Sequence, residues 1–108
     1  MNILVLIRKK KRRNKIIAGK KFQMQLSDLT EYLADFSPQT ARNMRSTIKE
    51  NLGLLELYPQ LGKLLDCGEY GERRILIVKK YIILYTYRGE TVHLDMILDE
   101  KMDYYHYI

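Results

Sequence analysis

The sequence predicts an α+β domain with the element order β-α-α-β-β-β, in which a hairpin of two helices packs on one face of a small, mainly antiparallel sheet. Apolar residues recur every three to four positions in two adjacent stretches between residues 22 and 58, which is the spacing of amphipathic helices. Short apolar runs rich in β-branched and aromatic residues follow between residues 74 and 98 and are typical of strands. Two helices cover one face of such a sheet, so the other face is left available.

The length of the chain indicates one core, because its 108 residues are 46% hydrophobic. We expect a single domain over residues 14–108, preceded by a basic extension over residues 1–13 in which six cations run from Arg8 to Arg13. Like charges in such a run repel each other, so the extension is either solvated or bound to something anionic. The formal net charge of +6 favours acidic or phosphate-rich partners.

Cysteine usage and hydropathy predict a cytoplasmic protein. Cys67 is the single cysteine, so neither an intrachain disulfide nor a cysteine-based zinc site is expected. The apolar start of the chain is followed, not preceded, by its positive charges, and it is too short to span a bilayer. We therefore expect no signal peptide, no transmembrane helix and no membrane partner.

The first half of the chain predicts a short strand and two helices. Residues 15–18 are a strand candidate, and helical spacing of apolar residues follows over 22–35. Ser37 is placed to cap the second helix, with Pro38 in its first turn, and Tyr58-Pro59 ends it. A link this short makes the two helices antiparallel neighbours.

The second half predicts three strands. Residues 74–87 form a hairpin whose turn is Lys79-Lys80, and its first strand carries apolar residues on both faces, so we expect it to be covered at least partly on each. Residues 91–98 alternate between apolar and polar and predict a half-buried strand. The stretch 59–73 holds three of the six glycines and is expected to be a loop.

Residues along most of the chain carry a resemblance to a known family. They are Gln25-Leu26, Leu29 and Tyr32-Leu33-Ala34 in the first helix, Ser37-Pro38 and Thr40-Ala41 in the link, Leu57-Tyr58-Pro59 and Gly62 after the second helix, Arg74, Leu76, Val78, Tyr81 and Tyr85 in the hairpin, and Ile97-Leu98, Lys101, Asp103 and Tyr104 in the closing segment. This ordered set, over about residues 14–105, resembles the RelE/ParE superfamily of toxins from bacterial toxin-antitoxin modules. The first thirteen residues have no counterpart there, and Asp99 stands where many relatives carry a histidine.

Similarity to the RelE branch implies a ribosome-dependent endoribonuclease that cuts mRNA by attack of a ribose 2′-hydroxyl on the adjacent phosphate, without a metal or cofactor. That reaction needs a base, fixed positive charge for the phosphate and an acid. Arg74 suits the phosphate, because its planar fork can hold two oxygens and stays charged. The predicted catalytic residues are Arg74, Lys101 and Tyr104, and the predicted RNA-binding residues are Lys79, Lys80, Tyr105 and His106.

Several of these assignments have a structural alternative. Lys79-Lys80 is equally explained as a solvated turn, and the tyrosines of the tail as a packing segment. The general base stays open among Asp66, Glu69 and Glu72 in the expected loop, with His93 on the polar side of a strand. Cys67 lacks the companion residues of a nucleophile, and the sequence shows neither a Gly-rich phosphate loop nor metal-ligand spacing.

Similarity to the ParE branch implies a different function, a non-enzymatic inhibitor of DNA gyrase, and an inactivated relative that only binds an antitoxin is a third possibility. Fold alone does not choose among them. Basic and aromatic residues favour the ribonuclease, whose partners are the ribosome and mRNA. All three imply an acidic antitoxin whose disordered segment folds on this chain, on the open sheet face or along the helices.

Overall fold

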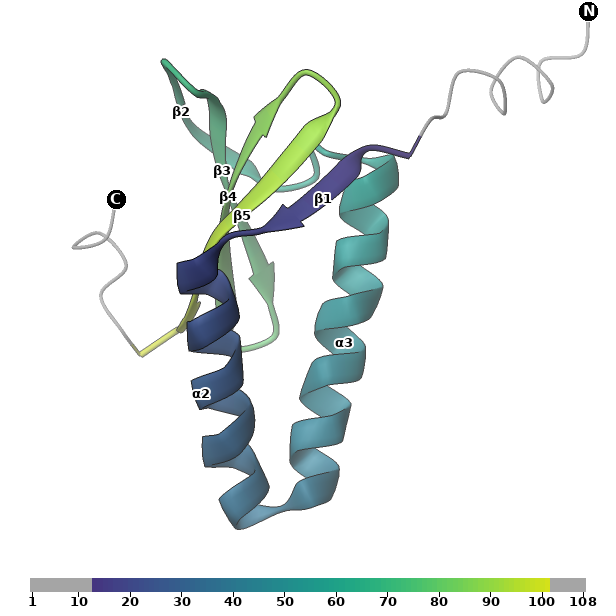
Figure 1. The fold of residues 1–108 in the computed structure, drawn as a ribbon, viewed down its shortest axis with the longest axis vertical. Coiled ribbons are helices and arrows are strands. Elements are labelled where there is room, and N and C mark those ends of the chain that lie inside the picture. Colours follow the sequence, from purple (N-terminus) through teal and green to yellow (C-terminus); the bar gives the residue numbers. More distant parts are fainter. Residues whose placement is uncertain (1–12, 102–108) are drawn as a thin grey trace, which may run out of the picture.

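The structure is a computed structural model, and it describes residues 13–101 (Figure 1). Its elements are β1 (Lys15–Ala18), α2 (Lys20–Phe36), α3 (Pro38–Leu57), β2 (Lys63–Gly68), β3 (Gly71–Val78), β4 (Tyr81–Arg88) and β5 (Thr91–Asp99). The predicted α+β class and the helical hairpin on one side of the sheet are confirmed. The expected basic extension lies almost entirely outside the described residues, so the boundary near residue 14 stays a prediction.

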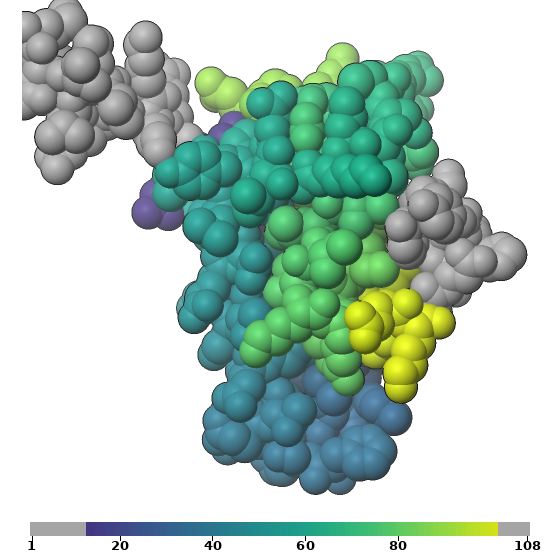
Figure 2. Space-filling model, turned by 180° about the vertical axis from the view of Figure 1, so that it is seen from behind, coloured from purple at the N-terminus to yellow at the C-terminus, as the bar shows by residue number. Residues whose placement is uncertain are grey.

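The two helices form the predicted antiparallel hairpin, and its tip projects beyond the sheet (Figures 1 and 2). Ser37 caps α3, since its hydroxyl oxygen accepts a hydrogen bond from the backbone N–H of Thr40 at 3.2 Å. Pro38 occupies the first turn, where its missing N–H costs no hydrogen bond. The first helix begins at Lys20, two residues before the predicted start at residue 22.

One sheet contains all five strands in the order β1-β5-β4-β3-β2. The pairs β2–β3, β3–β4 and β4–β5 are antiparallel, whereas β1 pairs in parallel with β5. The predicted turn at Lys79-Lys80 joins β3 to β4. β1 lies at one edge of the sheet, beside β5, and β2 lies at the other edge. The helices α2 and α3 join these two strands in the chain and cross one face of the sheet.

The expectation of a loop over residues 59–73 was wrong in its middle, where β2 forms an additional edge strand, and at its end, where β3 begins at Gly71 instead of residue 74. Five of its six residues are exposed, so it lacks the alternation of apolar and polar residues by which a strand is recognised. Its pairing with β3 shifts register between Leu64 and Asp66, which is a bulge. Hydrogen bonding to β3, rather than the burial of its own side chains, makes this segment a strand.

The main core lies between the helices and the sheet. Its largest fully buried side chains are Phe22 of α2, Leu55 of α3, Ile83 and Tyr85 of β4, and Val92, Leu94 and Ile97 of β5. A bulge in β5 at Asp95 interrupts the expected alternation, since Tyr85 pairs with Leu94 while Leu84 pairs with Met96. Ile97 therefore joins the helix-side core, and Met96 lies on the opposite face.

The face of the sheet turned away from the helices, called here the open face, has an apolar part and a polar part. Ile75, Ile82, Leu84 and Leu98 form a second, smaller buried cluster there. On this face of β3, Ile75 is buried whereas Ile77 is 69% exposed, so the strand is covered in part, as expected. Within residues 13–101 no helix is long and apolar enough to cross a membrane.

Candidate functional site

Arg74, the predicted phosphate ligand, is held by the fold. Its side chain is 12% exposed and lies on the same side of β3 as Leu76 and Val78, toward the helices. Its Nη1 donates to the carbonyl oxygens of Gly62 at 2.7 Å and Gln60 at 3.2 Å. Its Nη2 donates to the Glu72 carboxylate at 2.6 Å. The guanidinium thus ties the link between α3 and β2 to β3.

Glu72 completes this network from the start of β3. Besides Arg74, the side-chain amide of Gln60 donates to its two carboxylate oxygens at 3.2 and 3.1 Å. The hydrogen bond from Arg74, followed by that from Gln60, lowers the pKa of Glu72 below its ordinary value of 4.5, against a smaller effect of burial. Glu72 is therefore set up to stay ionised as the partner of Arg74, which does not suit a general base.

Three predicted lysines lie together at the far end of the β3–β4 hairpin. Lys79 and Lys80 form its turn, and the N–H of Glu100 donates to the carbonyl oxygen of Lys80 at 2.7 Å, which brings Lys101 beside them. Figure 2 shows the segment near residue 101 against this turn. The ammonium of Lys80 lies 5.5 Å from the centre of the Tyr81 ring, within the range of a cation–π contact.

Arg74 is distant from this group. A strand rises about 3.3 Å per residue, so the five residue steps from Arg74 to Lys79 correspond to about 16 Å along the hairpin. The structure therefore gathers Lys79, Lys80 and Lys101 but does not bring Arg74 to them. Tyr104, Tyr105 and His106 lie outside the described residues, and their predicted roles stay predictions.

Asp66, a second candidate base, is also paired with an arginine. Asp66 accepts two hydrogen bonds from Arg73, at 2.8 and 2.5 Å, and the hydrogen bond from Arg73 lowers the pKa of Asp66. Glu69 lies in the turn between β2 and β3. Among the described residues no group of three His, Cys, Asp or Glu side chains is placed to hold a metal ion, and Cys67 is exposed.

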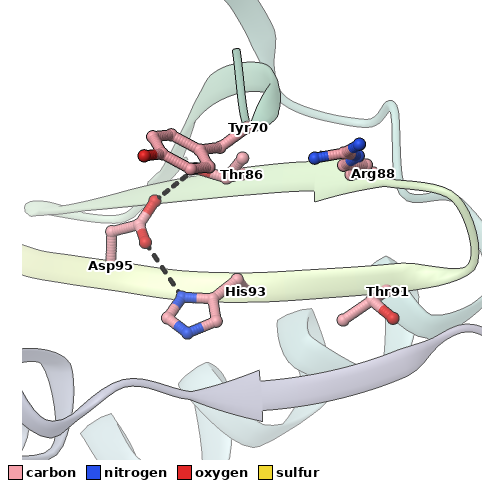
Figure 3. Close-up of a pocket in the computed structure, with 6 residues that line it drawn as sticks. All are labelled: Tyr70, Thr86, Arg88, Thr91, His93 and Asp95. Atoms are coloured by element: carbon pink, nitrogen blue, oxygen red, sulfur yellow. Dashed lines mark hydrogen bonds and ion pairs between the residues drawn. The ribbon is translucent and has the colours of Figure 1, made fainter. Parts of the chain in front are cut away.

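A polar row across the open face was missed by sequence reasoning. Strand register aligns His93, Thr86, Arg73 and Asp66 in that order across β5, β4, β3 and β2, and the apolar Ile17 of β1 lies next to His93. Asp95 connects two of them, since its carboxylate lies 3.0 Å from His93 Nδ1 and accepts the Thr86 hydroxyl at 2.7 Å (Figure 3). The sequence shows that His93 and Asp95 lie two residues apart on one strand. Their connection to Thr86 depends on how β5 pairs with β4, which the sequence does not show.

Comparison with known proteins gives a family and a fold. The model of the family described as "ParE toxin of type II toxin-antitoxin system, parDE" matches residues 16–104. A solved structure described as the chromosomal ParDE toxin-antitoxin system from P. aeruginosa superimposes with a TM-score of 0.64 over 81% of this chain and 96% of that chain, at 14% identity, which shows a common fold. No curated protein sequence was found to match. Because the family model spans most of the chain, the protein belongs to the ParE toxin family of type II toxin-antitoxin systems.

Proposed function

We propose that this toxin acts by binding DNA gyrase without catalysing a reaction. The observation that carries the proposal is the state of Arg74, whose Nη1 and Nη2 donate to two backbone carbonyls and to Glu72, while its Nε is buried without a hydrogen-bond partner among the described residues. Capturing a phosphate there would require those contacts to break. Membership of the ParE family supports the same conclusion, because the ParE branch is the one that the sequence resemblance connects with gyrase.

Cleavage of mRNA in the ribosome is the second candidate function. It is favoured by the grouping of Lys79, Lys80 and Lys101 at one end of the sheet, since clustered cations stabilise the charge of a phosphate in its transition state. In that mechanism Lys101 acts with Tyr104, while Tyr105 and His106 contact the RNA. Arg74 contributes by holding the fold of the sheet rather than by touching the phosphate.

One experiment in a bacterial host distinguishes gyrase binding from mRNA cleavage. The chain is expressed from an inducible promoter, and DNA breaks and mRNA 5′ ends are mapped in the same cells. Gyrase binding predicts DNA breaks with intact message. The triple variant Lys79→Gln, Lys80→Gln, Lys101→Gln serves as the matched probe, because it removes the clustered charge at exposed positions. New mRNA ends that vanish in this variant, without DNA breaks, would overturn the gyrase proposal in favour of the ribonuclease.

Purified components give the corresponding test in vitro. We expect the chain to increase the DNA cleaved by gyrase on a supercoiled plasmid, and we expect no cleavage of mRNA in a translating extract. The variant Lys49→Gln, on the exposed side of α3, controls for net charge. If saturating amounts of the chain leave the DNA cleavage by gyrase unchanged, the proposal is contradicted. Both targets place the action of the toxin in the cytoplasm.

We further propose that the toxin is neutralised by an acidic antitoxin whose disordered segment folds on the open face. The net charge of +6 attracts such a partner. Ile77, which is 69% exposed, offers an apolar anchor point there, and Leu65 of β2 packs against the apolar cluster on the same face. The helix tip is the competing surface, because Tyr32 and Phe36 are 60% and 74% exposed and their ring centres are 5.1 Å apart.

Two charge-introducing variants distinguish these surfaces. Ile77→Glu should weaken antitoxin binding by at least about tenfold, since it buries a charge in an apolar contact, whereas Phe36→Glu should leave it unchanged. Affinity is measured by isothermal titration with the protein recovered together with the chain from its native host. The reverse order of effects would move the antitoxin to the helices. Recovery of the chain without a partner from the native host would count against the antitoxin itself.

A further inference from the structure

We propose that the polar part of the open face is a binding site for a free mononucleotide. The site is a pocket of about 520 Å³ lined by Tyr70, Thr86, Arg88, Thr91, His93 and Asp95 (Figure 3). Pockets that hold small molecules span roughly 300 to 1,000 Å³, so the volume suits one nucleoside with its phosphate. The inference does not depend on which target the toxin has.

One end of the pocket suits a phosphate. Strand register places Lys15 of β1, Thr91 of β5 and Arg88 of β4 side by side. Alternation along each strand puts them on the open face, since Ile17, His93 and Thr86 are two residues away and lie there too. Two cations therefore flank a hydroxyl, and guanidinium and hydroxyl groups both donate to phosphate oxygens.

Arg88 is available for that role. Its hydrogen bond within the described residues runs from Nη1 to the carbonyl oxygen of Glu69 at 3.5 Å, which is at the limit for such a bond. Arg73, by contrast, is held by Asp66, and the negative charge of Asp95 adds to that pairing. Of the two arginines on this face, Arg88 is the one whose donors can turn to a ligand.

The other end of the pocket suits a planar ring. Tyr70 projects from the turn between β2 and β3, and it is 74% exposed. Figure 3 shows its ring above Thr86, on the side of the pocket away from Arg88 and Thr91. Arg88 lies two residues beyond Thr86 on the same face of β4, about 6.6 Å along the strand. A base stacked on Tyr70 therefore places its phosphate within reach of Arg88.

The floor of the pocket is polar and internally satisfied. Asp95 takes a hydrogen bond from Thr86 on one carboxylate oxygen and faces His93 Nδ1 with the other. With its proton on Nδ1, His93 donates to Asp95 and keeps Nε2 as an acceptor for a ribose hydroxyl or a base amine. The hydroxyl proton of Thr86 is directed to Asp95 rather than to His93, so Thr86 is not prepared as a nucleophile. The arrangement binds a ligand rather than cleaving it.

The test is an NMR titration of the full chain labelled with ¹⁵N. Adenosine, guanosine, cytidine and uridine 5′-monophosphates are each added, with the nucleosides, inorganic phosphate and trinucleotides as comparisons. We expect at least one monophosphate to shift the amides around residues 70, 88 and 91, and to bind about tenfold more tightly than its nucleoside or phosphate alone. Equal binding of inorganic phosphate, or shifts confined to other parts of the chain, would overturn the site.

Variants at exposed positions test each end of the pocket without threatening the fold. Arg88→Gln should weaken binding of the monophosphate about tenfold, whereas Lys49→Gln, an equal change of charge on α3, should leave it unchanged. Tyr70→Ala should weaken binding of the monophosphate about tenfold. Tyr70→Phe should bind it as tightly as the wild type does, because the ring and not the hydroxyl provides stacking.

Two further results decide against the proposal. If Lys49→Gln weakens binding as much as Arg88→Gln does, the attraction is that of the overall charge and no site exists. If a trinucleotide binds more than about tenfold more tightly than its monophosphate, the surface reads a nucleic-acid strand and not a free nucleotide.

Discussion

The hydroxyl oxygen of Tyr85 accepts a hydrogen bond from the backbone N–H of Gly62 at 2.8 Å. The same hydroxyl donates to the carbonyl oxygen of Pro59, also at 2.8 Å. Tyr85 is 1% exposed, so one side chain of β4 satisfies two backbone groups of the link between α3 and β2 in the protein interior. Arg74 binds the carbonyl oxygens of Gln60 and Gly62 in the same link. An irregular segment is thereby fixed on the sheet.

The variant Tyr85→Phe should lower the free energy of unfolding by about 1–3 kcal/mol, because it leaves the N–H of Gly62 and the carbonyl of Pro59 without their partner. Urea denaturation followed by circular dichroism measures the change. Tyr32→Phe removes the same hydroxyl from a side chain that is 60% exposed, and it should change stability by less than about 0.5 kcal/mol. Equal effects of the two variants would show that the Tyr85 hydroxyl has no structural role.

Tyr85 should also make stability fall at alkaline pH. Burial raises the pKa of its hydroxyl above the ordinary 10.0, with the hydrogen bond from Gly62 and the charge of Arg74 acting against it. Since the folded-state pKa is the higher one, this contribution is fully present below about pH 10 and is lost as the pH rises through the folded-state pKa. The difference in unfolding free energy between wild type and Tyr85→Phe should shrink over that range. A difference that is constant with pH would contradict the shift.

Gly62→Ala should be strongly destabilising. A Cβ at this position would lie 2.6 Å from the carbonyl oxygen of Ile75 and 2.8 Å from the Tyr85 hydroxyl, so the packing must shift at a cost of about 1–3 kcal/mol. Gly53→Ala is the matched control, because nothing lies within 4 Å of its Cβ position in α3, and it should stabilise the helix by about 0.5–1 kcal/mol. Thermal unfolding of both variants checks the opposite signs.

Glu72 should make stability decrease in acid. The pKa of its carboxyl is lowered by the hydrogen bonds from Arg74 and Gln60, so its contribution is present above about pH 4.5 and is lost as the pH falls through the folded-state value. The advantage of wild type over Glu72→Gln should therefore be largest near neutral pH and disappear on acidification. Glu31→Gln, which removes one exposed carboxylate from α2, is the matched control for the change of charge.

Lys79→Gly should stabilise the hairpin. Lys79 has a φ of +56°, a conformation that costs an L-residue about 1 kcal/mol and glycine almost nothing. Its neighbour Lys80 has no positive φ, so Lys80→Gly should give no gain and lose backbone order. Thermal unfolding of both variants, which remove the same charge, isolates the backbone effect. A melting temperature that falls equally in both would contradict it.

The elements that the sequence predicted are those encoded by local pattern. The helical hairpin depends on apolar spacing and on the cap at Ser37, and the β3–β4 hairpin depends on two apolar runs around Lys79-Lys80. These signals lie within a few turns of chain, so they can be read without knowing what packs against them. The family resemblance, later confirmed, rested on the same segments.

The relative positions of the site residues could not be read from the sequence, because residue type does not tell which way a side chain faces. Arg74 was expected to hold a phosphate, but it lies on the helix side of β3 among backbone carbonyls. Lys101 lies beside Lys80 because the backbone N–H of Glu100 donates to the carbonyl oxygen of Lys80, a contact between segments distant in the sequence. His93 was recognised as polar, but its link to Thr86 through Asp95 follows from a bulge that no local pattern announces.

By itself, the sequence determined the α+β class, the two helices, four of the five strands, and the family, since each is encoded by residues close along the chain. Tertiary structure alone decided that β2 is a strand, that β1 joins β5 in parallel, and that Lys15, Thr91 and Arg88 meet in one row. Strand pairing joins segments up to 76 residues apart, as at Lys15 and Thr91, and a shift of one residue in register would turn every side chain to the other face. Only the packing of the whole domain selects that register.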